Sequence, residues 1–398
     1  MFFLSILFWS CAIAMVHTYV LYPLLLKILA SGKVLPRHPY FDEKDSPEVV
    51  VLMAAYNEAT VIAQKIESLQ ALNYPAHKIK ILIGSDNSTD GTNGIIQQFA
   101  ATDYRIHLHA FTERNGKPRI INRLVAAVQK EQKLTPNLLF LMTDASVMLL
   151  PDTLRNLVRH VHDPKIALVD THFQSQPAGA AGIAVSEGQY VSGEVMLKHR
   201  ESLLWKRMIG PFGGCYLLRS SYYAPVPPNF LVDDFYIALK VFEQGGGAIN
   251  DLEARCYETS SDEISEEYRR KARIGAGNFQ NLQTFKHLLW SGDLPLAFAF
   301  TSHKILRWKG PFFIIFAFFS SAILAFSGNL FYLSLLLIQI SVWIILPLID
   351  LILWKFNIHL KPLRNLRYFV FMNLALLNGF FKYLNGIKTN VWQPTKRA

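Results

Sequence analysis

The pattern of apolar and polar positions divides the 398-residue chain into stretches of different periodicity. Apolar runs of about 20 residues, the length that a membrane-spanning helix needs, stand at the start of the chain and in its last quarter. Between them, short β-branched runs alternate with apolar residues at helical spacing. We therefore expect an α/β domain that is attached to membrane helices on both sides. The predicted parts are an N-terminal transmembrane helix (1–28), a linker (29–47), the α/β domain (48–265), a basic segment with interfacial amphipathic helices (266–309), and a C-terminal membrane region with a basic tail (310–398). In this C-terminal region we expect spans near 311–327 and 330–354, and a weaker candidate near 368–384.

Buried strands alternate with helices in the first part of the predicted domain. After the first β-branched run, for example, Ile62, Ile66 and Leu69 follow at helical spacing. The strands are predicted at 48–54, 79–84, 105–110, 138–142 and 166–170. Such alternation predicts a mainly parallel sheet with right-handed crossovers. The second part is less regular, with small and flexible residues at 174–187 and a helix over 230–243.

Basic residues beside the apolar runs predict how the chain crosses the membrane. Lys27, Lys33 and Arg37 follow the first run and place its C-terminal side, and hence the domain, in the cytoplasm. A third C-terminal span would put the tail outside, whereas its basic residues favour the inside. Two alternatives stay open: the last stretch lies in the interface, or the charge rule fails here. Asp350, close to Lys355, is interpreted as an end residue that reaches out of the span.

Composition narrows the class of partner. The net charge of +10 fits a protein that lies against an anionic membrane leaflet. Several basic residues flank apolar segments, and no stretch of basic residues alternates with aromatic ones as in a nucleic-acid-binding module. We therefore expect no nucleic acid as a partner. The three cysteines, Cys11, Cys215 and Cys256, show no metal spacing and no disulfide framework, which favours a reducing compartment.

Asp144 is the first candidate for chemistry. It follows the apolar run 138–142 directly, and Ser146 stands two residues further on. Open α/β sheets bind ligands beyond the carboxyl ends of their strands. One carboxylate with a small oxygen-bearing neighbour suits Mg²⁺ or Mn²⁺ that takes most of its ligands from a substrate diphosphate. An Asp that merely caps a turn is the alternative for Asp144 considered alone.

Six short motifs favour the metal-binding interpretation of Asp144 over the capping one, because all six occur in this chain, one after another. They are A-A-Y-N-E at 54–58, S-D-N-S-T-D-G-T at 85–92, N-G-K at 115–117, D-A-S at 144–146, V-D-D at 232–234 and R-K-A-R-I-G-A-G-N-F-Q at 270–280. Together they resemble the membrane-embedded branch of the family 2 glycosyltransferases, which includes cellulose, hyaluronan and poly-N-acetylglucosamine synthases. The resemblance implies a GT-A fold, a nucleotide-sugar donor, which we expect to be a UDP-sugar, and inversion at the anomeric carbon.

The resemblance also implies site residues. Asp234 would be the base that takes the proton of the acceptor, with Asp233 orienting it, although the two roles could be exchanged. Asp144 would hold Mg²⁺ or Mn²⁺ together with the donor, and Lys117, or alternatively Arg119, would face the diphosphate. The other implied substrate-binding residues are Ala55, Tyr56 and Glu58 for base and ribose, Asp86 for the uracil ring, Arg270 and Arg273 for pyrophosphate or acceptor, and Gln280. Asp90 is expected to cap a turn that Gly91 and Thr92 shape.

Three departures from the family pattern limit what the resemblance implies. Ser146 replaces the second Asp of the usual D-x-D metal motif. Arg270 and Ile274 replace the Gln and Trp of Q-x-x-R-W, and the spans are fewer than a translocation channel needs. We therefore expect single addition of a sugar to a membrane-associated glycan or lipid-linked acceptor, by a multi-pass protein of the cytoplasmic membrane, with Trp392 as an acceptor-side candidate. A processive exopolysaccharide synthase and a non-catalytic nucleotide-binding membrane subunit are the alternatives.

Overall fold

The computed structural model of the chain describes residues 1–177, 183–260, 264–356 and 358–391. It contains two compact units that are interleaved in the sequence. The helical unit comprises Met1–Leu29, Pro177–Gln189 and Ser261–Gly386, and the sheet unit comprises Ala30–Gln176, Tyr190–Ser260 and Ile387–Ala398. Each unit is described by itself below.

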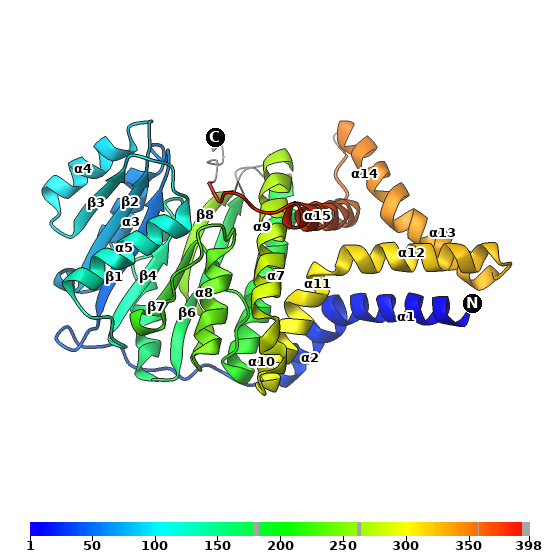
Figure 1. Ribbon diagram of the computed structural model, residues 1–398, viewed down its shortest axis with the longest axis horizontal. Helices are drawn as coiled ribbons and strands as arrows, with labels where there is room; N and C mark the ends of the chain where they lie inside the picture. Colours follow the sequence, from blue (N-terminus) through cyan, green and yellow to red (C-terminus); the bar gives the residue numbers. More distant parts are fainter. Residues whose placement is uncertain (178–182, 261–263, 357, 392–398) are drawn as a thin grey trace. The chain divides into compact units, whose positions relative to one another are not determined.

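The sheet unit is built on one mixed sheet, which in the described residues has eight strands in the order β3-β2-β1-β4-β7-β6-β8-β5. All of these strands except β5 are labelled in Figure 1. The strands are β1 (Glu48–Ala55), β2 (Ile79–Asp86), β3 (Ile106–Phe111), β4 (Leu138–Thr143), β5 (Met148–Leu149), β6 (Ile166–Pro177), β7 (Cys215–Arg219) and β8 (Gly247–Ser260). The first four are parallel to one another. β7 then runs antiparallel to both β4 and β6, and β5 pairs antiparallel with β8. The prediction of an α/β fold with a mainly parallel sheet is confirmed for the first half of the domain.

The parallel strands β1, β2 and β4 are covered on both faces, which explains their continuous apolar runs, whereas the edge strand β3 is only partly buried. All six residues of β4 and all of β1 after Glu48 are buried. The helices of this unit are α3 (Ile62–Gln70), α4 (Thr92–Thr102), α5 (Lys117–Glu131), α6 (Thr153–Val158) and α8 (Asp233–Glu243), with α7 (Ile183–Trp205) reaching into it from residue 190. Ile62, Ile66 and Leu69 of α3 are fully buried against the core, as their spacing predicts.

Helix α5 approaches β2 very closely, and a glycine makes this possible. A Cβ placed on Gly84 would lie 2.3 Å from Cγ2 of Ile120 on α5. No other residue type leaves room for that contact. The start of α5, at Lys117, is thereby held above the carboxyl ends of the strands.

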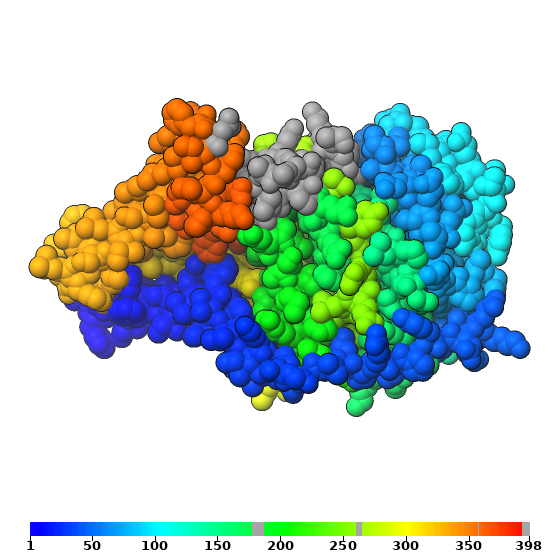
Figure 2. Space-filling view, turned by 180° about the vertical axis from the view of Figure 1, so that it is seen from behind, coloured from blue at the N-terminus to red at the C-terminus, as the bar shows by residue number. Residues whose placement is uncertain are grey.

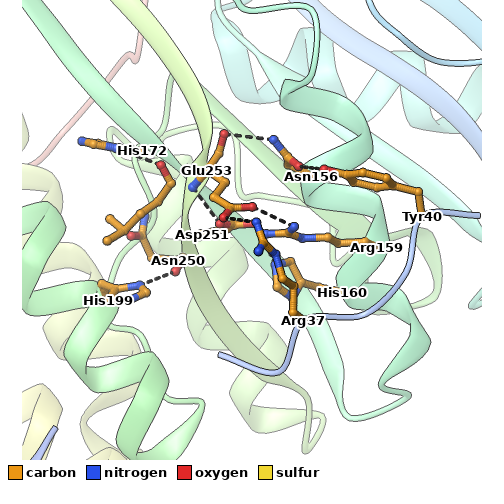
Figure 3. Close-up of polar contacts among 11 residues, drawn as sticks. Arg37, Tyr40, Asn156, Arg159, His160, His172, His199, Asn250, Asp251 and Glu253 are labelled. Atoms are coloured by element: carbon orange, nitrogen blue, oxygen red, sulfur yellow. Dashed lines mark hydrogen bonds and ion pairs between the residues drawn. The ribbon is translucent and has the colours of Figure 1, made fainter. Parts of the chain in front are cut away.

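Residues 35–47 form a strap along the sheet unit, without regular secondary structure apart from a turn at 43–45, and this strap is visible in blue in Figure 2. Arg37 pairs with Glu253 of β8 at 2.8 Å, and the Tyr40 hydroxyl donates to Asn156 at 2.7 Å. Figure 3 shows how these contacts continue into the protein, because Arg159 pairs with both Glu253 and Asp251. The strap and the middle of β8 are therefore held by one polar network.

The helical unit contains the apolar helices. They are α1 (Phe2–Val16), α2 (Tyr22–Leu29), α9 (Ile264–Phe285), α10 (Leu294–Ala299), α11 (Leu306–Trp308), α12 (Gly310–Phe326), α13 (Leu330–Ile340), α14 (Leu346–Lys355) and α15 (Lys361–Leu384). Among the described residues, the continuous helices Phe2–Leu29 and Leu330–Lys355 are long and apolar enough to cross a membrane. A third crossing is possible by these criteria if Leu294–Trp308 and Gly310–Phe326, which meet at a bend of 61°, form one broken span. The predicted stretch 368–384 is part of α15, which is not among these helices.

The structure corrects the interpretation of Asp350. Its side chain is only 4% exposed and pairs with Arg367 of α15 at 2.6 Å. The neighbouring helix thus offers a partner that the sequence around Asp350 does not show. A buried carboxylate beside an arginine costs less free energy than an unpaired one, so the side chain stays inside the unit.

Candidate active site

Loops that follow the parallel strands meet at one edge of the sheet unit, because these strands all end there. Asp90 ties two of the loops together. Its carboxylate accepts hydrogen bonds from the backbone N–H of Ala59 at 3.0 Å and of Thr92 at 3.1 Å. Gly91, which lies between Asp90 and Thr92, has φ +90°, a value that suits glycine. The predicted capping role of Asp90 is confirmed, and it fixes the loop that carries Tyr56 and Glu58.

Asp86, at the end of β2, is fully buried and faces the turn before α5. Its carboxylate accepts from the backbone N–H groups of Asn115 at 2.6 Å and Gly116 at 3.0 Å, and from Nε of Arg114 at 3.2 Å. The Arg114 guanidinium also lies 3.1 Å from the centre of the Tyr56 ring. Residues expected to hold the base therefore lie together, and Arg114 joins them.

The C-terminal stretch 387–391 covers the same turn. Asn390 donates a hydrogen bond to the carbonyl of Phe230, and its Oδ1 would lie 2.0 Å from a Cβ placed on Gly116, which has φ +81°. A cavity of about 400 Å³ remains beside this contact. Among the described residues its lining includes Arg114, Arg119 and Lys388 and no acidic side chain, so it suits an anionic ligand.

Lys117 lies between the carboxylates of two motifs that are far apart in the sequence. Its Nζ is 2.7 Å from Oδ1 of Asp144 and 3.7 Å from Oδ2 of Asp233. Burial alone would lower the pKa of Lys117, but the charges of Asp144 and Asp233 outweigh burial and raise that pKa above its ordinary value. Lys117 is therefore charged at neutral pH and holds the D-A-S and V-D-D motifs at one site.

Asp234 stands beside this group in the first turn of α8 and packs on the backbone of Gly213. A Cβ on Gly213 would lie 2.6 Å from Oδ2 of Asp234. Burial, followed by the negative charge of Asp233, raises the pKa of Asp234 to about 7. A carboxylate with this pKa can accept a proton near neutral pH, as a general base must.

Asp144 opens a tight turn, in which the N–H of Val147 donates to the Asp144 carbonyl at 3.3 Å. Within this turn the Ser146 hydroxyl donates to the carboxylate of Glu258 on β8. The buried ammonium of Lys65, on α3, donates to Thr143 Oγ1 at 2.8 Å and to the carbonyl of Val147. The two ends of the turn are thus fixed by one buried side chain.

Sequence reasoning missed Lys65, Glu258 and Tyr216. A signal for Lys65 was available, because a lysine stands on the apolar face of α3 beside Ile62 and Ile66, and burial lowers its pKa to about 8. Tyr216 of β7 is 1% exposed, and its hydroxyl has no hydrogen-bond partner among the described residues. Burial, then the charges of Asp233 and Asp234, raises the pKa of Tyr216 well above its ordinary value. Only the sheet pairing brings Tyr216 and Glu258 to the site.

The donor set at the Asp144 turn fits a divalent cation. Asp144 is 39% exposed, and it shares the turn with the Ser146 hydroxyl and the neighbouring Glu258 carboxylate. Hard oxygen donors of this kind suit Mg²⁺ and Mn²⁺. Within the part of the chain that the structure describes, no three His, Cys, Asp or Glu side chains gather to form a complete cage. The site therefore fits a cation that shares its coordination with a substrate phosphate.

The remaining predicted residues lie in the helical unit. Arg270, Arg273 and Gln280 are all on α9, and Arg270 pairs with Glu267 at 3.4 Å and with Glu187 at 3.6 Å. Their roles stay predictions. Trp392 lies outside the described residues.

Two family profiles match the sequence. The profile described as glycosyl transferase family 2 matches residues 50–221, and that described as glycosyl transferase family group 2 matches residues 139–382, more than half of the chain. The matches together cover the edge of the sheet unit described above.

Curated proteins with similar sequence match only over short stretches. The probable glycosyltransferase YdaM of Bacillus subtilis is 39% identical over 57 residues, 14% of each chain. The beta-monoglucosyldiacylglycerol synthase of Synechocystis is 28% identical over 120 residues, 30% of this chain and 24% of that protein. The same-named protein of Nostoc is 29% identical over 150 residues, 36% of this chain and 31% of that protein. The chain thus spans less than a third of each of these relatives.

A solved structure resembles the whole chain. The mannosyltransferase PcManGT of Pyrobaculum calidifontis, determined in complex with GDP-Man and Mn²⁺, superposes with a TM-score of 0.71. The match covers 96% of this chain and 99% of that chain at 20% sequence identity. This likeness supports the same fold in both proteins.

Proposed function

The chain belongs to the family 2 glycosyltransferases, and from this premise we propose that it transfers one sugar, with inversion, from a UDP-sugar to a membrane-associated lipid-linked or glycan acceptor. It is a hexosyltransferase with a GT-A fold that uses a nucleotide-sugar donor. The hexosyltransferase activity, the nucleotide-sugar donor with its UDP moiety, the acceptor and the roles of individual residues belong to the proposal.

One observation carries the proposal. Lys117 lies 2.7 Å from Asp144 and 3.7 Å from Asp233, and Asp233 is the neighbour of Asp234. The carboxylate assigned to the donor side and the carboxylates assigned to the acceptor side therefore border one site. A sugar transfer needs this arrangement, because the leaving group and the attacking group stand on opposite sides of the same anomeric carbon.

Asp234 acts as the base. The acceptor hydroxyl attacks the anomeric carbon while its proton passes to the Asp234 carboxylate, and the bond from that carbon to the diphosphate oxygen breaks. A positioned base contributes about 10²–10⁴ to the rate. Asp233 orients Asp234 and keeps its pKa high, and exchange of the two roles is the alternative.

Cationic side chains bind the donor. Lys117 faces the diphosphate and leaves its pairing with Asp144 when the donor arrives, whereas Arg119 lines the adjoining cavity and is the alternative. Asp144, with Ser146 beside it, would hold Mg²⁺ or Mn²⁺, which when bound neutralises charge that develops on the departing diphosphate. Tyr56, Glu58 and the backbone at Ala55 bind base and ribose, together with Asp86.

The acceptor is proposed from the relatives and from the helical unit. Two relatives are named for the synthesis of a glucosyldiacylglycerol, and two helices of this chain are long enough to cross a membrane. The helical unit also holds an apolar cavity of about 540 Å³ between α9, α12 and α15. Phe279, Phe312 and Tyr383 line it, together with one cationic residue, Lys309. We assign this cavity to the hydrocarbon part of a lipid acceptor, with Arg270, Arg273 and Gln280 on the same unit as acceptor-binding candidates.

The test uses the full chain, purified in detergent with added lipid extract, and a panel of nucleotide sugars. We expect release of UDP from one UDP-sugar, and we expect Asp144→Asn to lower this release by at least about 10²-fold. Glu131→Gln, an exposed acid on α5, serves as the control. Release without any dependence on Asp144 would contradict the site, a polymeric product would favour the processive alternative, and the absence of turnover with every donor would favour the non-catalytic one.

A further inference from the structure

The D-A-S motif offers one carboxylate where the family pattern has two, and a second carboxylate lies beside it in the structure. The Ser146 hydroxyl donates its hydrogen bond to Oε1 of Glu258. Ser146 belongs to the turn that begins at Asp144 and closes with the hydrogen bond of Val147. Since the ends of such a turn lie within about 7 Å of each other, the Glu258 carboxylate contacts the same four-residue turn, 144–147, that Asp144 opens.

Sheet pairing delivers Glu258 to this place. Met148 and Leu149 of β5 pair with Tyr257 and Cys256 of β8, so that Glu258 follows directly in register opposite the turn. Further back, Asp251 of β8 is held by Arg159 and His160 in the network of Figure 3, at 2.9 and 2.8 Å. β8 is thus held at Asp251 by this network and at Cys256 and Tyr257 by its pairing with β5, and these contacts set the position of Glu258.

From this geometry we infer that Glu258 supplies the second carboxylate ligand of the divalent cation, in place of the Asp that Ser146 replaces. The inference rests on the proposed function, because it assumes a cation bound at Asp144. Mg²⁺ and Mn²⁺ sites with substrate phosphates use one or two protein carboxylates, and Asp144 with Glu258 meets that number. Ser146 is then a positioning residue that holds Glu258 toward the cation.

The charge of Glu258 can be removed without removing its acceptor oxygen. Glu258→Gln keeps a carbonyl oxygen for the Ser146 hydroxyl, so a purely structural role for Glu258 would survive this change. The double variant Ser146→Asp with Glu258→Gln returns the carboxylate to the position that the family pattern gives it. Glu131→Gln, which removes an exposed charge from the same unit, is the matched control.

The measurement is Mn²⁺ affinity in the presence of UDP, by titration calorimetry or by the free-Mn²⁺ signal in electron paramagnetic resonance, on the full chain in detergent. We expect Glu258→Gln to weaken Mn²⁺ binding by at least about 10–100-fold, the loss that removal of an outer-shell partner already causes. We expect the double variant to recover most of the loss and UDP binding in EDTA to stay unchanged. Unchanged Mn²⁺ affinity in Glu258→Gln would overturn the inference. If Asp144→Asn still abolished Mn²⁺ binding in that case, the proposed function would stand without this ligand.

A second measurement needs no variant and therefore does not depend on the folding of one. Fe²⁺ bound in place of Mn²⁺, with ascorbate and peroxide, cleaves the backbone near its ligands. We expect cleavage both around 144–146 and around 256–260 in the wild-type chain. Cleavage at the first segment alone would count against Glu258, and cleavage at neither would count against the metal site of the proposed function itself.

Discussion

At the scale of the residue, Asp234 shows how local surroundings set a chemical property. Its carboxylate packs on Gly213, where a Cβ would lie 2.6 Å away, and Asp233 adds a second negative charge. Burial and that charge raise the pKa of Asp234 to about 7. An ordinary Asp titrates near pH 4, so Asp234, unlike an ordinary Asp, changes charge near neutral pH.

The pH dependence of activity follows from this pKa. We expect kcat/KM to rise as the pH increases toward about 7, where Asp234 becomes ionised, and to level off above it. Asp234→Asn should lower kcat by about 10²–10⁴ while leaving donor affinity nearly unchanged. The measurements are pH–rate profiles and UDP binding for the wild type, Asp234→Asn and, as a control on the same helix, Glu243→Gln.

The same experiment distinguishes the two acids. If Asp233→Asn, and not Asp234→Asn, removed the rise in activity, the roles of these residues would be exchanged.

Folding stability gives an independent check on the pKa of Asp234. Because the pKa of Asp234 is raised in the folded state, its contribution to stability is present below about pH 4 and is lost as the pH rises through about 7. Asp234→Asn should flatten this decline in melting temperature.

Residues that belong to a recognisable short motif were located from the sequence, whereas residues outside any motif were not. Lys117, Asp144 and Asp233 were predicted from short motifs, and the structure gathers them in one ion-paired group. Glu258 reaches Ser146 across 112 residues, and no local pattern marks such a contact. The interpretation of Asp350 was wrong for the same reason, since Arg367 belongs to another helix.

At the scale of the element, the contact between α9 and α15 depends on small residues. A Cβ on Gly379 of α15 would lie 2.7 Å from the carbonyl oxygen of Ala272 and 2.8 Å from the backbone N of Ala276. On the α9 side, Gly275 lies next to Gly379 and Leu376. The two backbones therefore touch, as in helix pairs that pack through small residues.

We expect Gly379→Leu to destabilise this helix pair by about 1–3 kcal/mol or more, because the side chain has no space. Gly193→Ala in α7 is the matched control, since nothing lies within 4 Å of its added Cβ and alanine favours a helix. The measurement is the melting temperature of each variant in detergent. Equal melting temperatures for Gly379→Leu and the wild type would contradict the close crossing.

Elements with a clear apolar pattern were predicted well, and those without one were not. The strands β1, β2 and β4 lie within one or two residues of their predicted ranges, because their runs are buried on both faces. The stretch 174–187 was interpreted as flexible, yet β6 extends to Pro177 and α7 begins at Ile183, with 178–182 outside the described residues. Small residues in α7 give no apolar face at helical spacing, so the helix was missed. The helix predicted over 230–243 begins only at Asp233.

At the scale of the whole molecule, two units share one chain that passes between them several times. The apolar helices belong to one unit and the polar edge of the sheet to the other. With a net charge of +10, the chain carries basic residues that suit an anionic leaflet. We propose that it is a multi-pass protein of the cytoplasmic membrane with the sheet unit in the cytoplasm.

We expect the full chain to sediment with membranes, to resist alkaline carbonate and to be released by detergent, because two apolar helices can each span the bilayer. Cysteines introduced at exposed positions, such as Tyr104→Cys in the sheet unit, should react with an impermeant reagent only after the membrane is opened. Extraction by carbonate would contradict the spans, and labelling in intact cells would contradict the cytoplasmic side.

The covering of Gly116 by Asn390 has a consequence for how the protein is made. Residues 30–260 supply nearly all of the sheet unit, but the hydrogen bond from Asn390 to Phe230 forms only after α15 has been synthesised. Chains still on the ribosome can pack the sheet early, as domains commonly do during synthesis, yet they lack the cover over the turn that precedes Lys117. Translation thus orders the events, and a nascent chain completes the cavity beside this turn only after α15.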